Sequence, residues 1–349
     1  RQLQLARHLR GRCYDRHGQG NRRTCGARRV NWKPPSGVAV ARQRAAMLER
    51  ARSFFRSRGV LEVDTPALSR FTTSDPNIES LRVAGPREAT LYLQTSPESF
   101  MKRLLADGYP DIYAICRVFR DGESGRLHQP EFTMVEWYRH GFGLRAMIDE
   151  TVAFIADVLQ QPELKDAATL EFETAFRRFA GVEPLTASLD ELADAAAADA
   201  GLRESLGDDR DAWLDLLLST RVAPNFADRQ LTVLRHFPAS QAALARICPA
   251  DDRLADRFEV FHGAIELANG FVELRRPDEQ RRRMHADLSS RHASARRPVP
   301  LDEPLLAALE SGLPDCAGVA VGFERLLVLA TGAADIRDIL TFAFDDKGD

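Results

Sequence analysis

The stretch from Ile112 to Tyr138 restricts the possible folds most, because it indicates two strands joined by a short polar loop. Residues Ile112 to Phe119 alternate and are rich in β-branched and aromatic types, which favour strands. Further strands are expected at Leu91 to Leu93, Ile265 to Leu274 and Val319 to Val321. Helices separate these strands irregularly, unlike the regular alternation that builds a parallel sheet. We therefore expect an α+β fold with an antiparallel sheet.

Helix and domain boundaries follow from apolar spacing and from the absence of linkers. Apolar residues recur at helical spacing over Val38 to Arg58 and over Leu144 to Leu159. Gly59 is placed to end the first of these two expected helices. No stretch rich in Pro, Gly or Ser divides residues 38–349. We expect these residues to form one domain with a mostly helical insertion around 160–230.

Charge is distributed unevenly along the chain. Residues 1–33 contain ten Lys or Arg and one acid, Asp15, whereas the remainder contains 38 basic and 50 acidic residues. Because residues 1–37 are basic and show little periodicity, we expect them to form a disordered tail. Such a tail could contact RNA or an acidic partner, and the alternative is a non-native start of the chain.

Several protein classes lack support in the sequence. No apolar run approaches the length of a membrane helix and no secretory signal is evident, so we expect a cytoplasmic protein without a membrane partner. The five cysteines are widely spaced and form no CxxC pair, which disfavours a disulfide framework and a zinc ribbon. The eight histidines show no metal-ligand spacing, and P-loop, Rossmann, zinc-protease and α/β-hydrolase motifs are absent. A bound nucleotide would have to be held by side-chain cations on a different kind of sheet.

The first of three informative stretches runs from Arg58 to Leu68. It places a short extended segment and the dipeptide Thr65-Pro66 behind a long helix. Proline cannot donate to a strand ladder, so this pattern suits an edge or interface strand, although many domains begin in this way.

The second stretch is the expected hairpin, whose polar side chains suit both an anionic and a cationic ligand. Arg120 ends the first strand, where a permanently charged guanidinium can meet a phosphate. Phe132 on the returning strand can stack on a base. Glu136 and Tyr138 are two residues apart and share a face, where a carboxylate beside a phenol can bind an ammonium group. The alternative is a charged surface hairpin.

The third stretch, Gly318 to Leu326, combines glycines with a cation at a helix start. Glycine allows close approach of the backbone to a ligand. Arg325 is expected in the first turn of a helix, where a cation opposes the helix dipole unless an anion is bound nearby. Alone, this stretch would be read as a core strand flanked by glycines.

These three stretches, in this order, resemble the three motifs of the class II aminoacyl-tRNA synthetases, and their detail resembles the lysyl branch. The resemblance covers about residues 38–349. It includes three segments similar to the lysine and ATP pocket of that branch: Thr95 to Glu98, His128 to Thr133 and Glu266 to Leu274. It implies a class II synthetase-like catalytic domain with an antiparallel sheet flanked by helices, the use of ATP and Mg²⁺, and a homodimer.

Within this class the chain is similar to the truncated relatives of lysyl-tRNA synthetase that modify elongation factor P. Only about 40 residues precede the first motif, too few for an OB-fold anticodon-binding domain. His236 to Gln241 resembles a segment of the truncated family, and Ala320 stands where lysyl-tRNA synthetases typically have glycine. The resemblance implies activation of (R)-β-lysine, or lysine, and transfer to a lysine ε-amine of elongation factor P, with no tRNA. The Ala320 methyl group would favour the shifted amine of β-lysine, but the sequence leaves the choice of isomer open.

The resemblance also implies roles for individual residues. Arg120 would clamp the α-phosphate and the amino-acid carboxylate, and Arg325 would hold the γ-phosphate of a bent ATP. Glu266 and Glu273 would hold Mg²⁺, with a bulge or turn at Asn269-Gly270 restoring a common face, or Glu273 would contact the substrate instead. Other expected ATP contacts are Asp121, Gly122, Glu123, His128, Gln129, Phe132, Leu267 and Gly322. Other expected amino-acid contacts are Ser96, Pro97, Glu98, Glu136, Tyr138, Asn269 and Ala320.

The chain departs from the family pattern at three positions. The acid that follows the hairpin arginine is displaced to Glu123, Gln129 replaces the usual Asn, and Glu324 replaces the usual Asp. These departures leave two alternatives open: a catalytically weakened binding protein, and a lysyl-tRNA synthetase of unusual form. Structural rather than chemical roles are expected for Cys116, Cys316 and His236.

Overall fold

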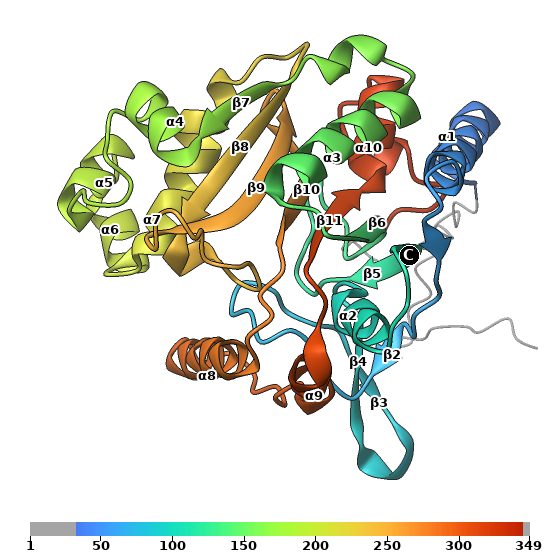
Figure 1. Ribbon diagram of the computed structural model, residues 1–349. Helices are drawn as coiled ribbons and strands as arrows, with labels where there is room; N and C mark the ends of the chain where they lie inside the picture. Colours follow the sequence, from blue (N-terminus) through green and yellow to red (C-terminus); the bar gives the residue numbers. More distant parts are fainter. Residues whose placement is uncertain (1–32, 345–349) are drawn as a thin grey trace, which may run out of the picture. The chain divides into compact units, whose positions relative to one another are not determined.

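The computed structural model describes residues 33–344, and its centre is a twisted sheet of eight strands (Figure 1). In spatial order the strands are β1 (Leu61–Glu62), β5 (Ile112–Phe119), β6 (Glu131–His140), β11 (Cys316–Gly322), β10 (Ile265–Val272), β9 (Leu254–His262), β8 (Leu231–Pro238) and β7 (Ala168–Glu171). All inner neighbours pair antiparallel, as expected, whereas the two edge strands β1 and β7 pair parallel with β5 and β8. The expected α+β fold is confirmed, with a mixed rather than purely antiparallel sheet.

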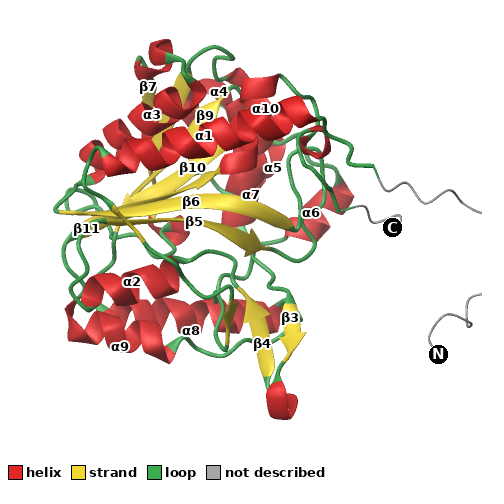
Figure 2. Cartoon of the chain, turned by 90° about the vertical axis from the view of Figure 1, so that its right-hand side faces the viewer, coloured by secondary structure: helices red, strands yellow, loops and turns green. Residues whose placement is uncertain are grey.

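Helices cover both faces of the sheet (Figure 2). One face carries α1 (Val38–Arg56), α3 (Leu144–Leu159) and α10 (Phe323–Thr331), and the other carries α2 (Glu98–Ala106), α8 (Pro277–Ala293) and α9 (Glu303–Gly312). The expected helices at 38–58 and 144–159 are therefore confirmed. Gly59 follows the first of them at φ +68°, a left-handed conformation that suits glycine and turns the chain into β1.

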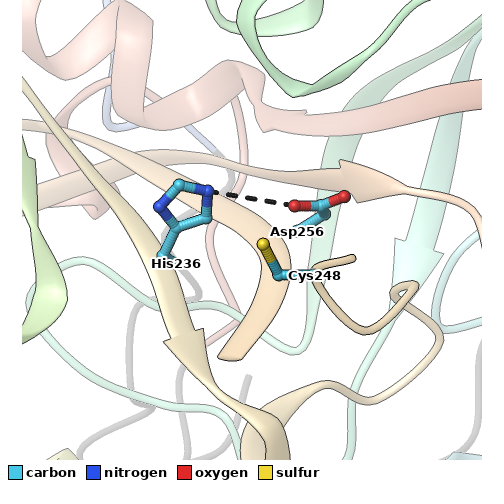
Figure 3. A group of neighbouring side chains, drawn as sticks. All are labelled: His236, Cys248 and Asp256. Atoms are coloured by element: carbon cyan, nitrogen blue, oxygen red, sulfur yellow. Dashed lines mark ion pairs between the residues drawn. The ribbon is translucent and has the colours of Figure 1, made fainter. Parts of the chain in front are cut away.

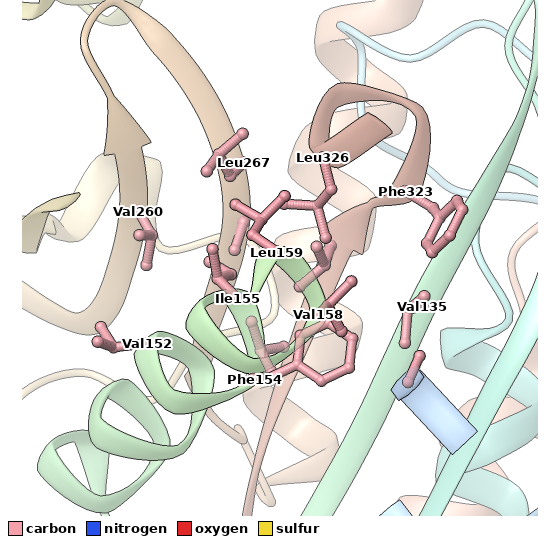
Figure 4. Packing of buried hydrophobic residues seen from close by; sticks show 14 of the residues in the cluster. Val135, Val152, Phe154, Ile155, Val158, Leu159, Val260, Leu267, Phe323 and Leu326 are labelled. Atoms are coloured by element: carbon pink, nitrogen blue, oxygen red, sulfur yellow. The ribbon is translucent and has the colours of Figure 1, made fainter. Parts of the chain in front are cut away.

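The main core lies between the sheet and the helices α1, α3 and α10. Figure 4 shows Phe154, Ile155 and Leu159 of α3 packed among apolar side chains from β9, β10 and α10. The Phe55 ring of α1 lies 4.2 Å from the Tyr113 ring and 5.2 Å from the Trp137 ring, between centroids. Such aromatic contacts add to the free energy of burial, so this layer fixes how β5 and β6 are placed.

Two smaller units flank the main sheet. A second sheet has the order β2 (Leu68–Ser69), β4 (Thr90–Leu93) and β3 (Arg82–Ala84), and β3 and β4 form the hairpin at the bottom of Figure 1. The residues expected to form a helical insertion contain α4 (Phe172–Phe179), α5 (Leu189–Ala195), α6 (Ala200–Leu206) and α7 (Arg210–Leu217). These helices have an apolar cluster of their own, which includes Trp213 and Phe176 and reaches Phe237 of β8.

One expected break in a strand is absent. β10 continues through Asn269 and Gly270, which pair in regular register with Glu259 and Phe258 of β9. The irregularity lies earlier, where the register shifts between Glu266 and Ala268. The prediction of a bulge or turn at Asn269-Gly270 was therefore wrong in its position.

Other expectations concern the ends of the chain and membranes. Residues 1–32 of the expected basic tail lie outside the described residues. Between residues 33 and 344, no helix is both long and apolar enough to cross a membrane.

Candidate active site

A cavity of about 1410 Å³ lies between the sheet and α8, and it collects most of the residues singled out in the sequence. Arg120, Glu266, Glu273 and Arg325, which come from separate parts of the chain, all line it. The other expected residues that line it are Ser96, Glu98, Glu123, His128, Gln129, Phe132, Glu136, Tyr138, Leu267, Asn269, Ala320 and Gly322. Pro97, Asp121 and Gly122 are not among the lining residues: Pro97 precedes α2, and Asp121 and Gly122 lie exposed in the loop between β5 and β6.

Arg120 stands at the turn of the β5–β6 hairpin. Its backbone N–H donates to the carbonyl of Pro130 at 2.9 Å, which closes the hairpin. Its guanidinium lies 5.2 Å from the centroid of the Phe132 ring and 3.4 Å from the Glu123 carboxylate. The buried Nε atom of Arg120 has no hydrogen-bond partner among the described residues, so a donor is left for an anionic ligand.

Arg325 lies in the first turn of α10, as its position in the sequence indicated. One guanidinium nitrogen donates to the backbone carbonyl of Glu266 at 2.7 Å and lies 3.4 Å from the Glu266 carboxylate. The other donates to Nε2 of His128 at 2.9 Å. Burial and the charge of Arg325 lower the pKa of His128, which keeps this imidazole neutral and able to accept that bond.

A cluster of carboxylates occupies the other end of the cavity. As expected from their spacing, Glu136 and Tyr138 face each other, and the phenol donates to the carboxylate at 2.7 Å. The Ser96 hydroxyl donates to the second oxygen of Glu136 at 2.8 Å. Burial and the charge of Glu98 raise the pKa of Glu136 to about 7, and burial raises that of Glu273 to about 8. These acids would be stabilised in their charged form by a bound ammonium group.

Lys102 is a buried cation that the sequence reasoning missed. Its Nζ atom lies 2.5 Å from the Glu98 carboxylate and 2.6 Å from the Glu273 carboxylate. Burial lowers the pKa of Lys102, but the two carboxylates outweigh this effect and raise it above its usual value. The signal available in the sequence was the spacing of four residues between Glu98 and Lys102 on a helix, which alone indicates a surface pair.

The two acids predicted to share a metal ion do not lie together. A strand advances about 3.3 Å per residue, so the seven steps from Glu266 to Glu273 separate their Cα atoms by about 23 Å. Glu273 is instead paired with Lys102, at the carboxylate end of the cavity. The prediction that these two residues form one metal site was therefore wrong, and the alternative role for Glu273 fits its surroundings.

Glu259 of β9 is the acid that lies beside Glu266. Glu266 pairs with Phe261, two residues along β9 from Glu259, so the two carboxylates face the same side of the sheet. Burial and the charge of Glu266 raise the pKa of Glu259 to about 8, against the opposing effect of Arg257. Two neighbouring carboxylates on one face of the sheet suit a hard cation such as Mg²⁺. This pair was not predicted from the sequence, because it depends on the β9–β10 register.

Glycines and small residues keep the carboxylate end open. A Cβ atom at Gly318 would lie 2.7 Å from Oε1 of Glu273 and closer still to the Tyr138 ring. Ala320 pairs with Glu136 on one side and Asn269 on the other, so its methyl group lies in the middle of the floor of the cavity. The size of the residue at 320 therefore bears on the shape of a ligand bound there.

Three further residues are held by the protein itself. Glu324 is buried, accepts from the backbone N–H of Thr133 at 2.7 Å and pairs with Arg44, so it ties α10 to β6 and α1. Gln129 is buried and accepts from the backbone N–H of Phe344 at 2.8 Å. The Leu267 side chain belongs to the main core, so this residue can offer the cavity little beyond its backbone.

Comparison with known proteins shows the family to which the chain is similar. The family model of class II tRNA synthetases (D, K and N) matches residues 25–346. Over 323 residues the chain is 44% identical to an elongation factor P--(R)-beta-lysine ligase of Sodalis glossinidius, covering 90% of this chain and 98% of that protein. It is 43% identical over 321 residues to the protein of the same name from Photorhabdus laumondii, with 90% and 98% covered. A third relative of that name, from Pseudoalteromonas translucida, is 44% identical over 323 residues, with 89% and 97% covered.

Proposed function

Because this chain belongs to the class II tRNA synthetases (D, K and N), we propose that it is an ATP-dependent ligase that joins (R)-β-lysine, or lysine, to elongation factor P. The match to this chain covers 98% of the length of each of the first two relatives that carry that name. The observation that carries the proposal is one cavity with two arginines at one end and a buried carboxylate cluster at the other. This arrangement suits a triphosphate and a diamino acid held side by side.

The first step forms an acyl-adenylate. The amino-acid carboxylate attacks the α-phosphorus of ATP, a new C–O–P linkage forms, and pyrophosphate leaves. Arg120 neutralises charge on the α-phosphate and the attacking carboxylate, and Arg325 holds the γ-phosphate with His128 supporting its guanidinium. Phe132 stacks on adenine, and Glu123 is placed beside Arg120 to meet the nucleotide. Catalysis comes from positioning and charge neutralisation, since no protein atom bonds to the substrate.

The carboxylate cluster recognises the amines of the substrate. Glu136, held by Ser96 and Tyr138, receives one ammonium group, and Glu98 and Glu273 supply the remaining negative charge around Lys102. A bound ammonium group stabilises the charged form of the three acids, which then outnumber the one buried lysine, and this favours a substrate with two protonated amines over one with a single amine.

The family uses ATP with a metal ion, and Glu259 and Glu266 are the residues that would hold Mg²⁺ in this chain. When bound, Mg²⁺ would neutralise charge on the phosphates of the nucleotide. The carboxylate oxygens of Glu259 and Glu266 are of the kind that Mg²⁺ prefers as ligands. Binding of the ion would also relieve the repulsion between these two carboxylates.

The second step transfers the activated acyl group. The deprotonated ε-amine of a lysine of elongation factor P attacks the acyl carbon, an amide bond forms, and AMP leaves with the bonding electron pair. We place this reaction in the cytoplasm. We also propose a homodimer, because β1 is an edge strand of the sheet and Leu61 on it is 45% exposed.

Amino-acid-dependent exchange of pyrophosphate into ATP, followed by transfer to elongation factor P, tests the proposal. We expect exchange with (R)-β-lysine or lysine, and a stable mass increase of one acyl group on elongation factor P. No exchange with any lysine isomer would instead indicate a binding protein without activity. Charging of bulk tRNA without transfer to elongation factor P would indicate a synthetase of unusual form.

A further inference from the structure

Three potential metal ligands meet at a second place in the fold, away from the cavity. His236 ends the regular part of β8, Cys248 lies in the loop that follows, and Asp256 belongs to β9 (Figure 3). Their ligand atoms, an imidazole nitrogen, a thiol sulfur and a carboxylate oxygen, all lie within 4.8 Å of one another. We propose that these three residues bind a zinc ion that fastens the loop between β8 and β9.

The backbone is distorted in the way needed to direct His236 to this place. The β8–β9 register shifts between Arg235 and Phe237, because two residues of β9, Asp256 and Arg257, lie opposite His236 in a β-bulge. Its φ angle is +57°, a left-handed conformation that is uncommon for a residue with a side chain. Bulges of this kind re-aim a side chain, and a strained residue persists where the surroundings hold it.

Glu171 fixes which imidazole nitrogen is available. Its carboxylate accepts from Nδ1 of His236 at 2.7 Å and also pairs with Arg235. The other nitrogen, Nε2, therefore carries the lone pair in the neutral imidazole, and it lies 3.8 Å from Oδ1 of Asp256. A carboxylate on the distal nitrogen of a ligating histidine is the usual support of such ligands in zinc sites.

Asp256 keeps one oxygen for the site. Arg246 donates from Nε at 3.1 Å and from a terminal nitrogen at 2.6 Å, both to Oδ2 of Asp256. Oδ1 is the oxygen that faces His236. Nε2 of His236 and Oδ1 of Asp256 both carry lone pairs and face each other beside the Cys248 thiol. A cation bound between them would accept both lone pairs.

The ligand set favours zinc over other common ions. Zinc binds thiolate, imidazole and carboxylate ligands at about 2.0–2.3 Å, which puts neighbouring ligand atoms about 3.4–3.6 Å apart in a tetrahedral site. The three side chains would need to close by about an ångström, and a water molecule would complete the four ligands. A hard cation such as Mg²⁺ or Ca²⁺ would not select a thiol.

The site would act on the cavity from a distance. None of its three residues lines the cavity, but Ala239, Ser240, Gln241, Ala242, Ala243 and Leu244, which lie between His236 and Cys248 in the chain, all do. A metal ion joining β8, the loop and β9 would therefore hold one wall of the cavity in place. This inference is independent of the reaction proposed above.

Titration with cobalt and zinc tests the site. The untagged full-length protein is treated with a chelator, and Co²⁺ is then added alone. We expect a thiolate-to-cobalt charge-transfer band that Zn²⁺ removes, together with a higher Tm in Zn²⁺. Cys248→Ala is expected to lose both the band and the Tm increase, whereas the control Cys116→Ser, which removes a half-buried thiol on β5, keeps both.

Two further variants keep the test decisive. If Cys248→Ala does not fold, His236→Gln replaces it and is expected to weaken zinc binding in the same way. Glu171→Gln is expected to retain the band but to weaken zinc binding by about 10- to 100-fold, because it removes support without removing a ligand. Absence of the band from the unmodified protein, or its persistence when Cys248 or His236 is replaced, would overturn the proposal.

Discussion

Arg325 is the residue on which the nucleotide end of the cavity depends most directly. Replacing it with Ala removes the cation from the first turn of α10 and leaves His128 and Glu266 without their shared partner. We expect the rate of pyrophosphate exchange to fall by about 10²- to 10³-fold or more. Arg281→Ala is the matched control, because Arg281 is paired with Glu303 outside the cavity. Unchanged exchange in Arg325→Ala would contradict the γ-phosphate role.

Glu136 makes amino-acid binding depend on pH. Its pKa is raised to about 7, so the carboxylate is neutral at lower pH and no longer attracts an ammonium group. We expect the KM for the amino acid in the exchange reaction to rise as the pH falls below about 7, by up to about tenfold per pH unit. Glu136→Gln should have a high KM that lacks this pH dependence.

The effect of Glu136 on the stability of the fold depends on pH in the opposite direction to its effect on amino-acid binding. In the ligand-free protein its folded-state pKa lies above the usual value of 4.5, so the folded chain retains a proton that the unfolded chain loses. This contribution to stability is fully present below pH 4.5 and is lost as the pH rises through about 7. Denaturation of the ligand-free protein across this window, compared with Glu136→Gln, would measure it.

Ala320 bears on the choice between lysine isomers. Its methyl group lies on the cavity floor between Glu136 and Asn269. We expect Ala320→Gly to raise exchange with α-lysine relative to (R)-β-lysine by about tenfold, the effect of one methyl group in a pocket. Exchange rates with the two isomers, measured for both proteins, check this, and an unchanged ratio would show that selectivity arises elsewhere.

The sequence allowed some of these residues to be placed and not others. Glu136 and Tyr138 could be assigned to one face because the alternation of a strand decides it locally. Lys102 and Glu259 could not, because each acquires its meaning from a partner on another element, Glu273 and Glu266 respectively. The sequence around Lys102 does not distinguish a lysine that is buried between two acids from a lysine in a surface ion pair.

At the scale of elements, the close approach of β9, β10 and β11 at Gly270 is the most sensitive contact. A Cβ atom there would lie 2.7 Å from the Phe258 ring and 2.8 Å from Cβ of Val319. We expect Gly270→Ala to destabilise the fold by about 1–3 kcal/mol, because neither neighbour can move within the core. Gly143→Ala is the control, since no atom lies within 4 Å of its added Cβ. Urea unfolding of both variants checks this, and equal midpoints would contradict it.

The elements themselves could largely be predicted, because their apolar periods are long and clear. The helices at 38–58 and 144–159 and the strand at 112–119 agree with the structure to within a few residues. The bulge in β10 was misplaced because it depends on pairing with β9, which no pattern within β10 reveals. The parallel edge pairs were missed for the same reason.

At the scale of the whole molecule, the edge of the sheet at β1 predicts the oligomeric state. We expect Leu61→Asp to convert a dimer into monomers, because it puts a charge on the exposed apolar edge. Phe342→Asp, which alters another exposed apolar residue, should remain a dimer. Analytical ultracentrifugation distinguishes the two states, and a monomeric unmodified protein would contradict the proposed interface.

The place of β11 in the sheet has a consequence for synthesis of the protein. β11 holds the centre of the sheet, between β6 and β10, although it begins only at Cys316. While the chain leaves the ribosome, β6 of the β5–β6 hairpin and β10 of the β8–β9–β10 meander each have an unpaired edge. Both edges remain unpaired until β11 is available to hydrogen-bond with them. Ligand binding therefore cannot emerge gradually during translation. It arises in a single closing event once β11 has left the ribosome, and nascent chains are most exposed to mispairing just before it.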